Sequence, residues 1–112
     1  MESYESEIVE GLREGEVKSL EYIFDLYFLA LTRFACRFVP DEDHAKDMVQ
    51  DVFVNIWKNR EFICIDRSLE AFLYTSVKNQ CLNFLKHQKI KDKYNEVQGK
   101  IRDLEIRFYE SE

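Results

Sequence analysis

Helix-compatible spacing runs through almost the whole chain with few interruptions, and this feature limits the fold more than any other. The sequence holds three glycines, at positions 11, 15 and 99, and one proline, Pro40. Between these breakers, apolar residues recur every three or four positions, which is the period of a helix with one buried face. A sheet-rich fold requires more turn residues. We therefore expect an all-α fold, a compact bundle of three to four core helices plus a C-terminal helix or linker.

The first half of the chain predicts a short helix that ends near Leu12 and a longer helix over about residues 16–38. Pro40 cannot continue a helix and pushes Val39 toward extended geometry, so the longer helix should end there. Its apolar residues step by three or four and are expected to form one buried stripe. They are Val17, Leu20, Phe24, Tyr27, Leu31, Phe34 and Phe38.

The second half predicts two further helices. Asp41 or Asp43 is expected to cap a helix that runs to about Asn59, with acidic residues favoured in its first turn. Its apolar side consists of Ala45, Val49, Val52, Phe53, Ile56 and Trp57. After a loop at residues 60–67, the last helix is expected to begin at Asp66 or Ser68. No breaker follows before residue 99.

The end of the chain has a pattern of its own. We expect residues 1–92 to form one helical domain and residues 93–112 to begin an interdomain linker, whose apolar spacing is compatible with a helix. From residue 90 onward, apolar residues recur at heptad spacing, as in helices that pack against each other along one side. They are Ile90, Tyr94, Val97, Ile101, Leu104 and Phe108. This pattern is compatible with docking on the bundle, with a homodimer through the C-terminal helix, or with a mostly mobile tail.

Charge is distributed unevenly along the chain. The formal net charge is −6, which argues against a general binder of nucleic acid. Residues 1–30 hold eight acidic and two basic residues. Residues 67–93 reverse this balance, with six basic and two acidic residues. One basic region in an acidic protein is a more specific signal than the total charge.

Several function classes find no support in the sequence. No apolar run approaches the roughly 20 residues that cross a bilayer, and the acidic start is unlike a signal peptide, so we expect a cytoplasmic protein without membrane contact. Phosphate-loop, HExxH and GxSxG motifs are lacking, so we expect no enzyme and no catalytic residue. Cys36, Cys64 and Cys81 form no CxxC pair and are interpreted as reduced thiols that mostly fill the core, with no metal and no cofactor implied.

A polar stripe interrupts the last predicted helix. The stretch "FLYTSVKNQCLNFLKH" (residues 72–87) has helical apolar spacing, yet Thr75, Asn79 and Asn83 follow one another at intervals of four. Residues four apart share one face of a helix. Their short polar side chains compete for backbone hydrogen bonds, which makes them mediocre helix formers. From the spacing alone, the stripe is compatible with exposure to solvent, with bonding to neighbouring side chains, or with a partner outside the helix.

Two linked stretches carry a resemblance to a known family. They are "DEDHAKDMVQDVFVNIWKNR" (residues 41–60) and "SLEAFLYTSVKNQCLNFLKHQK" (residues 68–89). In order, they present an acidic turn, A-x-D-x-V-Q-D-x-F, a tryptophan, a short loop, and F-L-Y followed by spaced asparagines. This combination resembles region 2 of bacterial sigma factors, in the extracytoplasmic-function (ECF) group of the sigma-70 family. The resemblance extends over about residues 17–89.

The resemblance implies a surface that docks on RNA polymerase. In the family, the helix with the D-M-V-Q-D-V-F pattern binds the clamp helices of the polymerase beta-prime subunit. The matching polar residues here are Asp47, Gln50 and Asp51, which we expect on the face opposite the apolar side of their helix. That face offers acceptors and one amide to a basic partner helix. An anti-sigma protein is expected to compete for the same surfaces, by analogy with the family.

The resemblance also implies a surface for the non-template strand of the promoter −10 element. The residues assigned to it are Arg67, Phe72, Lys78, Asn79, Asn83 and Lys86. Asn79 matches the base-reading asparagine of the family, at the floor of a pocket walled by the preceding loop. Phe62 and Ile63 in that loop either line the pocket or hold the loop in place. Asn55 is not expected to contact DNA.

Three departures from the family and one rival interpretation remain. Thr75 stands where many relatives carry a basic residue, and the loop at residues 60–67 is more apolar than a typical capture loop. The chain ends at Glu112 without the helix-turn-helix that reads the −35 element, so we interpret the sequence as a fragment rather than a single-domain variant. The rival function is a helical protein–protein adaptor with no DNA role, which leaves the basic segment and the paired motifs unexplained.

Overall fold

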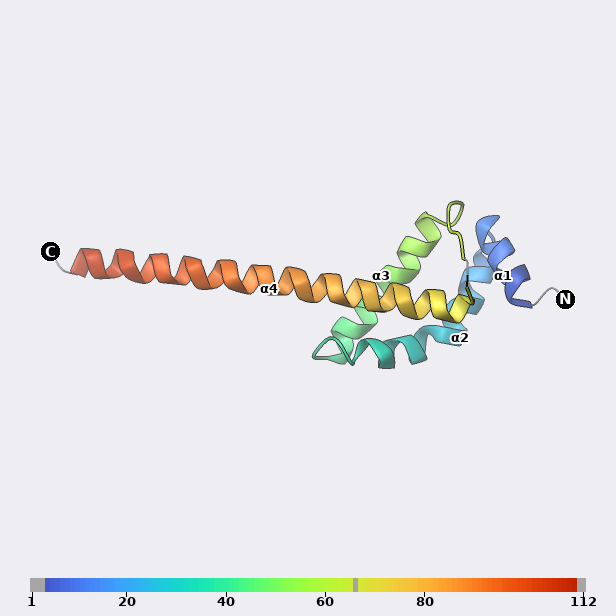
Figure 1. The fold of residues 1–112 in the computed structure, drawn as a ribbon, viewed down its shortest axis with the longest axis horizontal. Coiled ribbons are helices and arrows are strands. Elements are labelled where there is room, and N and C mark those ends of the chain that lie inside the picture. Colours follow the sequence, from blue (N-terminus) through green and yellow to red (C-terminus); the bar gives the residue numbers. More distant parts are fainter. Residues whose placement is uncertain (1–3, 66, 111–112) are drawn as a thin grey trace. The chain divides into compact units, whose positions relative to one another are not determined.

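The structure, a computed structural model, describes residues 4–65 and 67–110. These residues form four helices and no strand: α1 (Tyr4–Arg13), α2 (Val17–Ala35), α3 (Glu42–Lys58) and α4 (Leu69–Glu110) (Figure 1). The predicted all-α fold is confirmed. The chain divides into two compact units, residues 1–82 and residues 83–112. None of the helices in the described ranges combines the length and apolarity that a membrane span needs.

The turn between α1 and α2 depends on glycine. Gly15 has a φ of +86°, in the left-handed region that residues with a Cβ rarely adopt. The backbone N–H of Glu16 donates to the carbonyl of Gly11 at 2.9 Å, and that of Gly15 donates to Leu12 at 3.1 Å. These two bonds form a Schellman motif, which satisfies carbonyls at the end of α1 and lets the chain reverse directly into α2.

An aspartate cap starts α3 as predicted. Asp41 has extended backbone geometry, and its carboxylate accepts a hydrogen bond from the backbone N–H of His44 at 2.7 Å. Helix α2 ends at Ala35, earlier than predicted, and residues 36–38 form turns before Pro40. The alternative cap for α4, Asp66, lies outside the described residues.

The core of the first unit lies where α1, α2, α3 and the first turns of α4 meet. Helix α4 contributes buried residues at every fourth position, which forms one stripe along its inner face. They are Leu69, Leu73, Val77 and Cys81. The ring of Phe34 on α2 meets that of Tyr74 on α4 edge-on, with centroids 4.9 Å apart.

The predicted stripe of α2 is only partly correct. Val17 is 54% exposed, and the fully buried positions of the helix include Ile23 and Ala35, which were not predicted. Leu20 and Phe24 are half-buried. Helix α2 packs on α1 and on α3, and Phe34 also contacts Tyr74 of α4, so which of its residues are buried depends on several neighbouring helices.

Helix α1 holds the loop and the start of α4. The guanidinium of Arg13 donates to the carbonyl of Ile63 at 3.2 Å. The carboxylate of Glu5 accepts from the backbone N–H of Leu69 at 2.7 Å. The hydroxyl of Ser68 accepts from the backbone N–H of Ala71 at 3.1 Å, which completes the N-terminal cap of α4. Ile63 in the loop and Leu69 at the start of α4 are therefore held by residues of α1 that lie 50 and 64 positions earlier in the chain.

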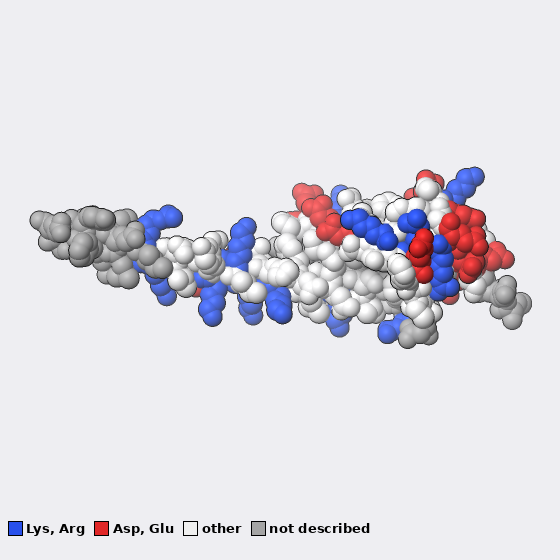
Figure 2. Space-filling model, turned by 90° about the horizontal axis from the view of Figure 1, so that it is seen from above, with Lys and Arg blue, Asp and Glu red and all other residues white. Residues whose placement is uncertain are grey.

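The second unit is the remainder of α4. Ile90, Tyr94 and Val97, the first half of the predicted heptad pattern, are exposed along it. The other three apolar positions of that pattern have side chains outside the described residues. Lysine side chains stand along this helix (Figure 2), and residues 83–102 contain six basic and two acidic residues. The proposed linker boundary at residues 92–93 stays a prediction.

Candidate polymerase and nucleic-acid interface

One side of α3 is polar and faces solvent. Asp47, Gln50 and Asp51 are all exposed, whereas the opposite side of the helix is buried. The buried residues of α3 are Ala45, Met48, Val49, Val52, Phe53 and Ile56. Val54 follows one turn after Gln50 and is 48% exposed. We refer to Asp47, Gln50, Asp51 and Val54 as the α3 outer face.

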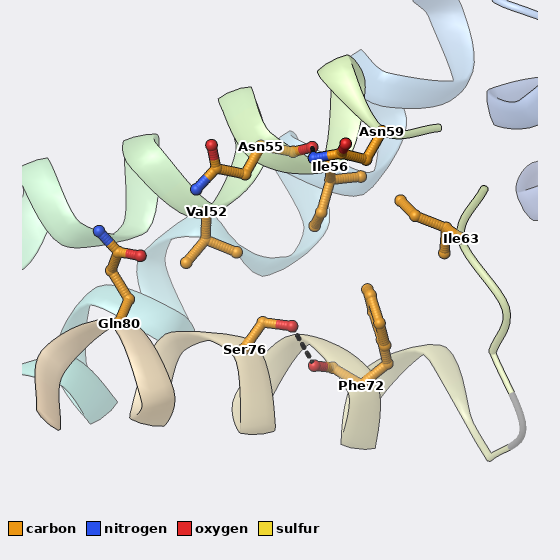
Figure 3. A pocket seen from close by; sticks show the side chains of 8 residues that line it. All are labelled: Val52, Asn55, Ile56, Asn59, Ile63, Phe72, Ser76 and Gln80. Atoms are coloured by element: carbon orange, nitrogen blue, oxygen red, sulfur yellow. Dashed lines mark hydrogen bonds between the residues drawn. The ribbon is translucent and has the colours of Figure 1, made fainter. Parts of the chain in front are cut away.

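A pocket of about 210 Å³ opens between α3, the following loop and α4 (Figure 3). It is lined by Val52, Asn55, Ile56, Asn59, Ile63, Phe72, Ser76 and Gln80. Val52 and Ile56 point from α3 toward α4, and Phe72 rises from α4 between Ile56 and Ile63 (Figure 3). We refer to this site as the α3–α4 pocket.

Two of the polar side chains at the α3–α4 pocket already form hydrogen bonds within their own helix. The hydroxyl of Ser76 donates to the carbonyl of Phe72 at 2.8 Å, within α4. The amide of Asn59 donates to the carbonyl of Asn55 at 2.9 Å, at the end of α3. Gln80 extends from α4 toward α3, on the side where Asn55 stands (Figure 3). The pocket therefore combines an apolar floor with amide groups, a combination that suits a flat polar heterocycle.

This pocket differs from the predicted one. Ile63 and Phe72 line it, but Asn79 does not, and Phe62 is 82% exposed. Asn55, Asn59 and Gln80 were not predicted as site residues. A signal was available in the spacing, because Phe72, Ser76 and Gln80 follow one another at intervals of four and so share one face of α4. Their convergence with Asn55 required the packing of α3 on α4.

The predicted DNA residues of the first unit lie on the surface. Lys78 and Asn79 are exposed on α4, two helical turns after the half-buried Phe72. The guanidinium of Arg67 approaches the hydroxyl of Thr75, with a long contact of 3.5 Å. Thr75 itself is uncharged, but the guanidinium of Arg67 places a positive charge beside it.

The predicted DNA residues of the second unit, Asn83 and Lys86, are also exposed. The exposed positions of Asn79 and Asn83 leave both amides accessible to a ligand. Whether any of the six residues contacts DNA stays a prediction.

The cysteines differ from the interpretation as mostly core residues. Only Cys81 is buried, while Cys36 and Cys64 are exposed. Burial raises the pKa of the Cys81 thiol, and the proximity of Cys36 raises it further. Cys81 therefore behaves as a packing residue of the α4 stripe.

Comparison with known proteins connects this geometry to one family. The family described as Sigma-70 region 2 matches residues 23–90. Among solved structures, the chain resembles an engineered region 2 of sigmaE, described as an NMR structure of a complex with GTAAAA. The two are 24% identical, with a TM-score of 0.70, over 80% of this chain and 93% of that one. A comparison with curated proteins gave no match. Because the family match covers more than half of the sequence, the chain belongs to the sigma-70 region 2 family.

Proposed function

We propose that the chain is region 2 of an ECF sigma factor, which binds the beta-prime clamp helices of RNA polymerase and recognises and melts the promoter −10 element. The observation that supports this proposal is the family match over residues 23–90, a range that includes both groups of predicted site residues. One group lies on α3, and the other lies on α4 and at Arg67 just before it, so two partners can bind through adjacent segments.

Polymerase binds to the α3 outer face. The carboxylates of Asp47 and Asp51 and the amide of Gln50 accept hydrogen bonds from basic side chains of the clamp helices. Charged groups at such a surface steer association and set its orientation, and they contribute most when the partner excludes water. An anti-sigma protein that covers the same face, and a homodimer through the C-terminal helix, stay predictions from the sequence.

Single-stranded DNA binds along the loop and the first turns of α4. The α3–α4 pocket takes an extruded base, which packs against Phe72 and is hydrogen-bonded by amides such as Gln80. Asn79 reads a neighbouring base, and Arg67 and Lys78 contact phosphates. The resembling region 2 of sigmaE forms a complex with GTAAAA, which supports a nucleic-acid partner. Asn83 and Lys86 belong to the second unit. They are assigned to this DNA surface only because they match the family pattern.

Trapping a base stabilises only the melted strand. Extruding one base costs a few kcal/mol of lost stacking and pairing, and a pocket that binds the base offsets that cost. The domain therefore shifts an opening equilibrium that already exists in the promoter, while the polymerase performs the chemistry of RNA synthesis.

Polymerase binding is tested by capture of the core enzyme on the immobilised full chain. Asp51→Arg should abolish capture, because it reverses a charge in the centre of the α3 outer face. Glu14→Arg makes the same charge change at an exposed turn far along the sequence and should bind like the wild type. Equal capture by wild type and Asp51→Arg would contradict the proposed docking face.

DNA recognition is tested with a clamp-helix fragment present. A single-stranded −10-like oligonucleotide should bind better than its duplex, and binding should weaken steeply with salt. Asn79→Ala should remove discrimination at one base position, by about 1–3 kcal/mol. Asn95→Ala removes an exposed amide of the second unit and should leave discrimination intact. An equal loss on every oligonucleotide would assign Asn79 a structural role.

A further inference from the structure

Helix α1 contacts the loop at residues 60–67 and the start of α4 through two charged side chains. Near the C-terminal end of α1, Nε of Arg13 donates to the carbonyl of Ile63 at 3.2 Å. Near its N-terminal end, the carboxylate of Glu5 accepts from the backbone N–H of Leu69 at 2.7 Å. Positions 5 and 13 are separated by about 12 Å along the axis of α1. Helix α1 therefore holds the loop near one of its ends and the start of α4 near the other.

The Arg13 bond acts on a residue that forms a wall of the α3–α4 pocket. Ile63 lines this pocket, where Phe72 rises between it and Ile56 (Figure 3). The carbonyl and the side chain of Ile63 are joined through one Cα, so a bond that fixes the carbonyl also limits where the side chain can lie. Because a charged donor forms a stronger hydrogen bond than a neutral one, the guanidinium is suited to this role. The Arg13 bond therefore helps to set the shape of the pocket.

The turn between α1 and α2 supports the beginning of the same loop. A Cβ at Gly15 would lie 3.5 Å from Nε of Arg60, so the guanidinium of Arg60 passes close to this turn. That guanidinium also lies 4.3 Å from the ring centre of Trp57, and its Nη1 donates to the carbonyl of Trp57 at 2.9 Å. The first residue of the loop is thus held between α3 and the turn, and Ile63 is held by α1 itself.

Helix α1 is poorly suited to bind DNA directly. Its charged residues are three glutamates and one arginine, and Glu7 and Glu10 are exposed. Negative charge of this kind repels phosphates. The guanidinium of Arg13 bonds to the carbonyl of Ile63, and its Nη1 lies 3.9 Å from the carboxylate of Glu10. Any effect of α1 on a DNA strand is therefore expected to act through the loop that it supports.

We propose that α1 is a positioning element for DNA recognition: Arg13 and Glu5 hold the loop and the start of α4 so that Ile63 stays in place as a wall of the base pocket. The inference rests on the proposed function, because it requires that the loop and α4 bind single-stranded DNA. Arg13 and Glu5 are positioning residues that do not touch the strand. Helix α1 ends before residue 23, where the family match begins, so the proposal adds a segment outside that match to the DNA-binding machinery.

Base discrimination tests the role of Arg13. The full chain, with a clamp-helix fragment present, is titrated with single-stranded −10-like oligonucleotides that vary one base at a time. Arg13→Ala should lose about three- to tenfold of discrimination at one base position, the same position that is affected by Gln80→Ala in the pocket. Arg13→Lys keeps a charged donor and should recover part of this loss. Arg33→Ala, which removes a guanidinium from an exposed position of α2, should discriminate like the wild type.

The salt dependence of binding separates positioning from direct contact. Each phosphate that a basic side chain neutralises adds about 0.7 to the slope of log affinity against log salt for a single strand. Arg13→Ala should weaken binding without changing this slope, whereas Lys78→Ala, at a proposed phosphate contact, should reduce it by about that amount. A reduced slope in Arg13→Ala would make Arg13 a DNA contact and overturn the positioning role.

A spin label on Cys64 reports on the loop in the absence of DNA. Cys64 follows Ile63 directly and is exposed, and Cys36→Ser removes the other exposed thiol. The label should become more mobile in Arg13→Ala than in the Cys36→Ser parent, because the bond to α1 is lost. Glu5→Ala removes the second anchor and serves as the second variant if Arg13→Ala unfolds; it should weaken oligonucleotide binding in the same direction.

The outcomes are distinct. If the wild type discriminates between bases and Arg13→Ala and Glu5→Ala discriminate equally well, the positioning role is wrong and the proposed function stands. If the wild type prefers no base at any position, the proposed DNA recognition is wrong and the positioning role is wrong with it. Arg13→Ala should still capture core polymerase like the wild type, and a loss of both activities together would replace the specific role with a general effect on folding.

Discussion

Loss of the Asp41 cap should weaken α3 by a predictable amount. The carboxylate accepts the backbone N–H of His44 at 2.7 Å, and its oxygens also lie 2.7–2.8 Å from the His44 ring nitrogen Nδ1. Asp41→Ala removes this acceptor and leaves the N–H to water. Because the site is exposed, the cost should be that of a typical cap, about 1 kcal/mol. Against a total stability of about 5–15 kcal/mol for a small domain, this loss is measurable.

The contribution of Asp41 also depends on pH with a defined sign. The hydrogen bond from the backbone N–H of His44, with a further bond from its ring, lowers the pKa of the Asp41 carboxyl below its ordinary value. Its contribution is therefore complete above the pKa of the unfolded chain and is lost as the pH falls through the pKa of the folded state. The stability difference between wild type and Asp41→Ala should shrink on acidification.

Urea unfolding followed by circular dichroism checks both statements. With a slope of about 2 kcal/mol per molar urea, a loss of about 1 kcal/mol lowers the midpoint by roughly 0.5 M at pH 7. Asp41→Asn keeps a side-chain acceptor and should lose less, which makes it the matched control. An unchanged midpoint in Asp41→Ala at pH 7, or a difference that grows in acid, would refute the assignment of the cap.

Two further predictions concern the core stripe of α4. Leu73→Ala at a position with 0% exposure should destabilise the domain by about 2–5 kcal/mol, whereas Leu82→Ala at 44% exposure should cost far less in the same urea titration. Cys36 and Cys64 should react quickly with a thiol reagent and Cys81 slowly, because Cys81 is buried and its thiol pKa is raised; equal rates for all three in the native protein would contradict the packing of α4.

The helices could be predicted from the sequence because the signals that start and end a helix act within a few residues. The side-chain caps of Asp41 and Ser68 both operate within one turn, and a helix begins beside each of them, whereas α2 ends at Ala35, five residues before Pro40. The family motif was readable for a similar reason, since its residues recur at fixed spacing along α3 and α4. The match over residues 23–90 confirms that reading.

Which residues are buried was less predictable, because burial depends on what packs against each side of a helix. The pattern of α2 marks Val17, Leu20 and Phe24 as core, yet Val17 is exposed and the other two are only half-buried. The hydrophobic period identifies an apolar face but does not say whether a second helix covers all of it. Cys36 shows the same limit, since it looks apolar in sequence and lies exposed at the end of α2.

The pocket residues show where tertiary structure was indispensable. Asn55 and Gln80 are ordinary surface amides in the sequence, and the packing of α3 on α4 brings both to one pocket. Arg13 holds the loop beside it at Ile63, and Glu5 holds the start of α4 at Leu69, although both residues lie far from these partners in the sequence. Short-range spacing was enough to predict the helices and the family, and Asp41 and Ser68 were among the predicted cap residues, because each of these features depends on residues close together in the chain. The uncovered apolar residues of α2 and the convergence of amides at the pocket could not be read in this way, because both depend on how segments distant in the sequence pack together.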